Sequence, residues 1–174
     1  MNILAISGSG RASSTNTALL RALAAAAPEH RISVFTGITA LPVFSPDLEA
    51  APLPRAVQDF ITLIRAAEGV IIASPEYVHS IPGGLKNAID WLVSRDEIIA
   101  KPIALLHASH RGEDMLAQLR LVLATVSSGF APEVFLRFAL MKLSPEAIAR
   151  YLGEAPQQQA LRAYVTAFAA QSAS

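Results

Sequence analysis

The sequence contains no cysteine, which excludes disulfides, thiolate metal ligands, cysteine nucleophiles and cysteine-bound clusters. Any redox chemistry in this chain would therefore require a bound cofactor. Charged residues are also scarce, at 16% of the 174 residues, and the 14 basic side chains balance the 14 acidic ones. Because there is no basic excess to attract a phosphate backbone, we expect no nucleic-acid binding.

Long apolar runs are missing as well. No run approaches the roughly 18–20 residues that are needed to span a bilayer, and the N-terminus lacks the basic start, apolar stretch and cleavage site of a signal peptide. We therefore expect no membrane association and a cytoplasmic location. The hydrophobic share of 52% is far too high for a disordered chain, and the length suits one domain over 1–174.

Short apolar runs alternate with helical patterns along the chain. Strands are predicted at 1–7, 31–35, 69–74, 102–107 and 133–138, and helices at 16–27, 55–67, 83–93, 113–126, 145–151 and 157–171, with a proline-rich connection over 36–54. Strict alternation of nearly continuous apolar strands with helices predicts a parallel sheet that is covered by helices on both faces. Such a sheet binds its ligand at the carboxyl ends of the strands.

The loop after the first predicted strand has the composition of an anion site. Its sequence is Gly8-Ser9-Gly10-Arg11-Ala12-Ser13-Ser14-Thr15-Asn16, so hydroxyls and one guanidinium precede the start of a helix, where the helix dipole favours negative charge. A dinucleotide fingerprint fails because Ser13 stands at the third glycine position, and a P-loop lysine is missing. A monophosphate therefore fits best. The alternative is a serine-rich loop in which Asn16 merely caps the helix.

A long motif follows the third predicted strand. The sequence of 74–91 is SPEYVHSIPGGLKNAIDW, which resembles the P-E-Y-x-x-S-x-P-G-x-L-K-N-A-I-D-W motif of the NADPH-dependent FMN reductase family. The first loop fits the same family's G-S-x-R-x-x-S-x-N pattern, and LPVFSPDLE at 41–49 resembles a third of its motifs. The resemblance runs from residue 1 to about 123.

The resemblance implies a flavodoxin-like three-layer αβα sandwich, whose five-stranded parallel sheet has the order 2-1-3-4-5. It also implies FMN at the switch point over the first and third strands. The residues that inherit the phosphate site are Ser9, Arg11, Ser14 and Asn16, joined by Thr15. Those expected along the isoalloxazine are Pro75, Glu76, Tyr77 and Val78. Many relatives carry asparagine where this chain has Val78, so flavin affinity or ring tilt is expected to differ.

The turn after the fourth predicted strand differs from the family pattern. His110 and Arg111 replace small residues of a glycine-rich turn. We expect Ser109 to donate to the N1/O2 edge of reduced flavin, and Arg111 or protonated His110 to raise its potential. The spacing of two histidines before two carboxylates also permits a metal interpretation. We do not favour it, since the first of them, His107, is expected to end a buried strand and face away.

The resemblance implies an NAD(P)H-dependent oxidoreductase. Hydride would pass from NADPH or NADH to flavin N5, and two electrons would then pass to a small acceptor such as a quinone, azo compound, metal oxyanion or free flavin. No catalytic side chain is expected, because the flavin carries the chemistry. A homodimer or homotetramer is expected, with contacts at 41–53 and at the helix around 85–91. Two alternatives remain: an FMN-binding carrier or redox sensor without NAD(P)H turnover, and a relative that has lost its flavin.

Overall fold

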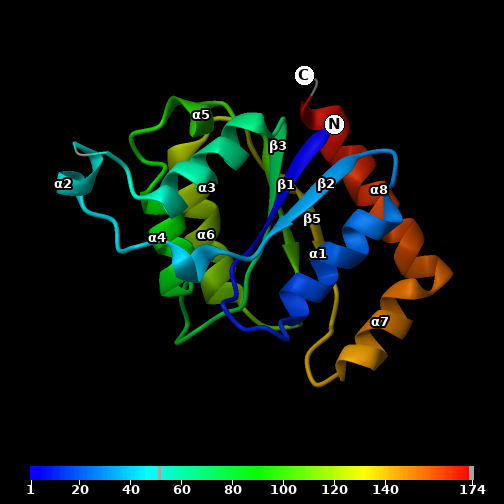
Figure 1. The fold of residues 1–174 in the computed structure, drawn as a ribbon. Coiled ribbons are helices and arrows are strands. Elements are labelled where there is room, and N and C mark those ends of the chain that lie inside the picture. The colour runs from blue at the N-terminus through cyan, green and yellow to red at the C-terminus, as the bar shows by residue number, and fades with distance from the viewer. Residues whose placement is uncertain (51, 173–174) are drawn as a thin grey trace.

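The computed structural model describes residues 1–50 and 52–172. Its strands are β1 (Asn2–Ser7), β2 (Arg31–Phe35), β3 (Gly69–Ala73), β4 (Ile103–His107) and β5 (Phe130–Arg137). They form one sheet in the order β2-β1-β3-β4-β5 with every pair parallel (Figure 1). The predicted all-parallel sheet and its strand order are confirmed.

Helices cover both faces of this sheet. They are α1 (Thr15–Ala26), the 3-10 turn η1 (Ile38–Ala40), α2 (Pro46–Glu49), α3 (Arg55–Ala66), α4 (Gly83–Asp90), α5 (Asp96–Ile99), α6 (Glu113–Val126), α7 (Pro145–Gly153) and α8 (Ala155–Ser172). Figure 1 shows α3, α4 and α6 on one side of the sheet, and α1, α7 and α8 on the other. Because successive strand residues point to opposite faces, Leu4 and Ile6 join one core and Ile3 and Ala5 the other. The three-layer prediction is confirmed.

Several element boundaries differ from the sequence prediction, each for a local reason. The fifth strand begins at Phe130 rather than 133, because the exposed Pro132 is tolerated at the sheet edge beside a register shift. Helix α4 ends at Asp90 rather than at 93, because the backbone N–H groups of Leu92 and Val93 donate to carbonyls three residues earlier in a tightened turn. The short η1, α2 and α5 were not expected, and neither were the longer ends of α7 and α8.

Helix α4 holds the proline-rich connection in place. Asn87 Oδ1 accepts a hydrogen bond from Phe44 N at 2.8 Å, and Asn87 Nδ2 donates to the Pro42 carbonyl at 3.0 Å. Trp91 Nε1 donates to the same carbonyl at 2.8 Å, and the Trp91 side chain is completely buried. The asparagine and tryptophan of the long motif therefore stabilise this connection within the chain. On the same helix Lys86 Nζ lies 2.5 Å from Asp90 Oδ1, an i, i+4 ion pair.

Within residues 1–50 and 52–172, no helix is both long enough and apolar enough to cross a membrane.

Candidate functional site

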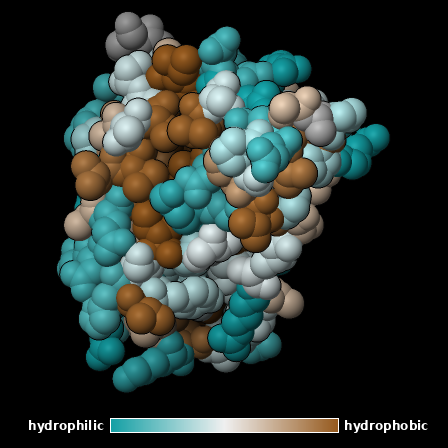
Figure 2. Space-filling model, turned by 90° about the vertical axis from the view of Figure 1, so that its left-hand side faces the viewer, coloured by the Kyte–Doolittle hydropathy of each residue, from teal (hydrophilic) through white to brown (hydrophobic). Residues whose placement is uncertain are grey.

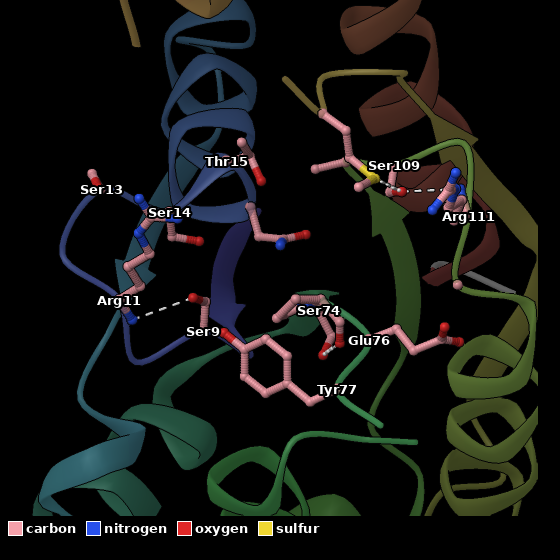
Figure 3. Close-up of a pocket in the computed structure, with 15 residues that line it drawn as sticks. Ser9, Arg11, Ser13, Ser14, Thr15, Ser74, Glu76, Tyr77, Ser109 and Arg111 are labelled. Atoms are coloured by element: carbon pink, nitrogen blue, oxygen red, sulfur yellow. Dashed lines mark hydrogen bonds between the residues drawn. The ribbon is translucent and has the colours of Figure 1, made fainter. Parts of the chain in front are cut away.

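A cavity of about 380 Å³ lies at the carboxyl edge of the sheet (Figure 3), within the size range of small-molecule and cofactor sites. It is lined by the loops that follow β1, β3 and β4, together with one side chain after β5. The lining residues are Ser9, Arg11, Ser13, Ser14, Thr15, Asn16, Ser74, Pro75, Glu76, Tyr77, Ala108, Ser109, Arg111, Gly112 and Met141. All of the residues predicted to bind the cofactor except Val78 are among them, and so is Arg111, whereas His110 is not.

Gly8, which directly follows β1, packs closely against the loop that follows β3. Gly8 N donates to the Ala73 carbonyl at 2.8 Å. A Cβ at Gly8 would lie 2.6 Å from Ser74 Oγ and 2.9 Å from a Leu85 methyl carbon, closer than atoms pack. Only glycine fits this position, and from it the two loops diverge around the cavity.

The N-terminus of α1 opens into the cavity. Ser14 is the N-cap residue, and its Oγ accepts from Thr17 N at 3.3 Å. The alternative that Asn16 merely caps the helix is therefore wrong, because Asn16 already lies in the first turn. The Asn16 side chain is buried, and its Oδ1 has no hydrogen-bond partner among the described residues. A buried acceptor without a partner lowers stability, so Asn16 Oδ1 is available to a ligand group that donates a hydrogen bond.

Arg11 adds a positive charge beside this helix start. Its backbone N donates to Ser9 Oγ at 3.3 Å, which fixes the loop (Figure 3). Its guanidinium is exposed and has no partner in the part of the chain that the structure describes. The helix dipole and Arg11 therefore favour an anion at the same place.

The loop after β3 ends in a tight hairpin. Tyr77 and Ser80 exchange backbone hydrogen bonds of 3.1 and 3.0 Å, and the two residues between them have positive φ, 52° at Val78 and 57° at His79. This pair defines a type I′ turn, which favours Asn and Gly over a β-branched residue. The Val78 side chain is 96% exposed and does not line the cavity. The neighbouring Tyr77 ring extends toward Ser9 (Figure 3).

Side chains of α6 hold this hairpin. His79 Nδ1 lies 2.6 Å from Asp114 Oδ2, and Gln118 Nε2 donates to the His79 carbonyl at 2.8 Å. The Glu76 carboxylate accepts from Met115 N at 3.0 Å and so caps the first turn of α6. Glu76 lines the cavity, but its charge is used at this helix start.

The carboxylates that suggested a metal have other partners. Glu113 pairs with Arg137 at 2.7 Å, and this guanidinium lowers the pKa of the Glu113 carboxyl. Asp114 pairs with His79. Within 1–50 and 52–172 no group of three or more histidine, aspartate or glutamate side chains is placed to hold a metal ion.

The loop after β4 is rigid. His107 is buried, and its Nε2–H donates to the Arg111 carbonyl at 2.6 Å. Burial lowers the pKa of His107, and the nearby positive Arg137 acts in the same direction. Arg111 N donates to Ser109 Oγ at 2.9 Å, and the Ser109 hydroxyl donates to Met141 Sδ. The Ser109 proton is thus directed at the thioether in this structure, and its donation to flavin stays a prediction.

Met141 was not predicted as a site residue. It lies in the segment between β5 and α7, where Leu140 N donates to the Ala108 carbonyl at 3.3 Å and extends the sheet pairing beyond the strand. This pairing brings Met141 to the cavity beside Ser109. No sequence motif marks it, because its position depends on the register of the edge strand.

The chain is similar in sequence to known proteins. Residues 1–139 match the model of a family described as NADPH-dependent FMN reductase, somewhat further than the motifs extend. The chain is 39% identical over 111 residues to an NAD(P)H-dependent FMN reductase of Pseudomonas aeruginosa, covering 63% of this chain and 60% of that protein. It is 36% identical over 116 residues to a quinone reductase of Escherichia coli K12, covering 64% and 61%. The chain thus spans about three fifths of the length of these curated relatives.

Solved structures share the whole fold. A flavoenzyme NAD(P)H:(acceptor) oxidoreductase from Paracoccus denitrificans superimposes with a TM-score of 0.77 at 24% identity, covering 98% of both chains. The flavodoxin-like fold that the resemblance implied is therefore confirmed.

Positive φ at Val78 predicts that Val78→Asn stabilises the protein. Asparagine tolerates the left-handed region better than a β-branched residue, so we expect the free energy of unfolding to rise by about 1 kcal/mol. Urea unfolding measures this change. Val93→Asn is the control, because Val93 is also exposed but has no positive φ. An equal gain in the free energy of unfolding in both variants, or no gain in Val78→Asn, would show that the backbone at Val78 is not strained.

The lowered pKa of His107 predicts a pH dependence of stability. The unfolded chain takes up a proton near the ordinary histidine pKa of about 6.5, whereas the native state resists it. This contribution to stability is therefore fully present above that pH and is lost as the pH falls below it. In urea titrations between pH 7.5 and 5, His107→Gln should show a smaller loss than wild type. The exposed His110→Gln should follow wild type, and parallel curves for all three proteins would refute the assignment.

Proposed function

The chain belongs to the NADPH-dependent FMN reductase family, and on this premise we propose that it binds FMN in the cavity and passes electrons from a reduced nicotinamide nucleotide to a small acceptor. The supporting observation is the set of polar groups that gather at the start of α1. Free N–H groups of the first helical turn, the guanidinium of Arg11 and the unpartnered acceptor Oδ1 of Asn16 face one cavity.

The residues present fit FMN. A phosphate at α1 would accept from backbone N–H groups and from Arg11, and the buried Asn16 Oδ1, which is an acceptor, would accept from a ribityl hydroxyl. Such a group would remove the one unpaired polar atom of the cavity wall that is buried. The cavity then continues past Ser74 toward Ser109, on the side away from Arg11, and the Tyr77 ring lines it beside Ser9 (Figure 3). This is the room that a planar ring system requires.

When bound, FMN supplies the two-electron chemistry, and the protein holds and shields it. Pro75 and Tyr77 offer apolar surface along the β3 loop. The α6 contacts of Glu76 and His79 keep this loop in one conformation, so the ring surface is preformed. No side chain is needed as a general base, and Glu76, the one acid that lines the cavity, is occupied at the start of α6.

We propose NADPH or NADH as the electron donor and a quinone, azo compound, metal oxyanion or free flavin as the acceptor. Relatives named as FMN, quinone and azo-dye reductases support this range. The expected homodimer or homotetramer remains a proposal. Figure 2 shows apolar side chains gathered on the face that includes α2 and α4, and exposed Val43, Leu48 and Val93 belong to this part of the chain.

An absorbance experiment tests the function. The protein is incubated with FMN, desalted, and mixed anaerobically with NADPH or NADH. We expect retained flavin bands that bleach on addition of nucleotide and return when a quinone is added. Bands that persist with both nucleotides would instead indicate the FMN-binding carrier or sensor, and a protein that retains no flavin would contradict cofactor binding.

Substitution of Arg11 tests the phosphate site. Arg11→Ala removes a charge-assisted contact worth about 1.5–3 kcal/mol, so FMN should dissociate about 10- to 100-fold more readily. Quenching of flavin fluorescence measures the dissociation constant. Lys86→Ala is the control, because Lys86 pairs with Asp90 on α4 and does not line the cavity. If Arg11→Ala and wild type bind FMN with equal affinity, the phosphate does not bind at this loop.

A further inference from the structure

The cavity has a second guanidinium that the FMN phosphate does not use. Arg111 lines the wall after β4, on the opposite side of the cavity from Arg11 (Figure 3). Its side chain is exposed, and its guanidinium has no hydrogen bond or ion pair with any of the described residues. One phosphate at the start of α1 satisfies Arg11 and leaves this charge unpaired.

The backbone of Arg111 is fixed although its side chain is free. Its N–H donates to Ser109 Oγ, and its carbonyl accepts from His107 Nε2 at 2.6 Å. Gly112 follows with φ of 106°, and a Cβ there would lie 2.9 Å from His107 Nε2. A rigid turn therefore presents the guanidinium at the cavity, which lowers the entropic cost of binding an anion.

Acids near Arg111 do not neutralise it. Glu76 caps α6 through Met115 N, Glu113 pairs with Arg137, and Asp114 pairs with His79. All three carboxylates thus have other partners. The Arg111 guanidinium therefore has no carboxylate partner among the described residues and is available to a second anion.

We propose that Arg111 binds a phosphate of the reduced nicotinamide dinucleotide and so determines the affinity for the electron donor. This inference rests on the proposed function. The donor brings two phosphates, or three in NADPH, whereas quinones and azo compounds need carry no charge. A guanidinium can bind a phosphate through two parallel hydrogen bonds. The sequence offers no G-x-G-x-x-G segment for the pyrophosphate, so single contacts at the cavity mouth carry its recognition.

The test follows anaerobic flavin bleaching in FMN-loaded wild type, Arg111→Ala, Arg111→Lys and Arg162→Ala. Arg162 is an exposed arginine of α8 outside the cavity and serves as the matched control. Three donors are compared: NADPH, NADH and N-benzyl-1,4-dihydronicotinamide, which has no phosphate. Reoxidation by neutral benzoquinone and by anionic ferricyanide is measured separately.

We expect Arg111→Ala to raise the half-saturating NADPH concentration about tenfold and to leave the limiting rate within twofold. The rate with the phosphate-free donor should be unchanged, lysine should restore part of the affinity, and Arg162→Ala should match wild type. An equal rise for NADH and NADPH would assign Arg111 to the pyrophosphate, and a rise confined to NADPH would assign it to the 2′-phosphate.

Three results would overturn the inference. The first is an unchanged half-saturating concentration for both dinucleotides. The second is an equal loss with the phosphate-free donor, which would show that Arg111 acts on the flavin. The third is an effect confined to ferricyanide, which would assign the anion to the acceptor. If wild type bleaches with none of the donors, the proposed function itself fails, which is a distinguishable outcome.

Discussion

The contact between Gly8 and Ser74 determines where the rest of the site lies. β1 and β3 are adjacent in the sheet, and their loops leave its carboxyl edge in different directions. The β1 loop leads into α1 on one face, whereas the β3 loop leads into α4 on the other (Figure 1). The cavity opens at this topological switch point, where Gly8 leaves room for the side chains of Ser74 and Leu85 that a Cβ would overlap. The N-terminus of α1 therefore faces the cavity.

The acidic side chains near the cavity have partners among the residues that the structure describes, whereas the guanidinium groups of Arg11 and Arg111 in the cavity wall have none there. Three acids lie near the N-terminus of α6. Glu76 accepts a hydrogen bond from the first turn of this helix, and Glu113 and Asp114, which belong to the helix, pair with Arg137 and His79. The same contacts fasten the β3 hairpin and the edge strand β5 to one helix. The acids therefore serve structure and leave the arginines of the cavity free.

Much of the fold could be predicted from the sequence. Short apolar runs that alternate with amphipathic helices lead directly to the parallel sheet, and nine of the predicted residues line the cavity. Features that depend on tertiary contacts could not be predicted. Ser14 rather than Asn16 caps α1, because the cap depends on where the chain leaves the strand. Val78 points into solvent because the hairpin turns it away. Met141 reaches the cavity through pairing at the sheet edge, for which no local pattern exists.

The central claim is that a phosphate anchors the cofactor at the N-terminus of α1. Comparison of FMN with riboflavin tests it most directly, since the two differ only in the phosphate. Calorimetric titration of the flavin-free protein with each compound gives both dissociation constants. The account predicts that FMN binds at least about 100-fold more tightly, because the helix dipole, the first-turn N–H groups and Arg11 all contribute to its phosphate. Equal affinity for riboflavin and FMN would contradict it.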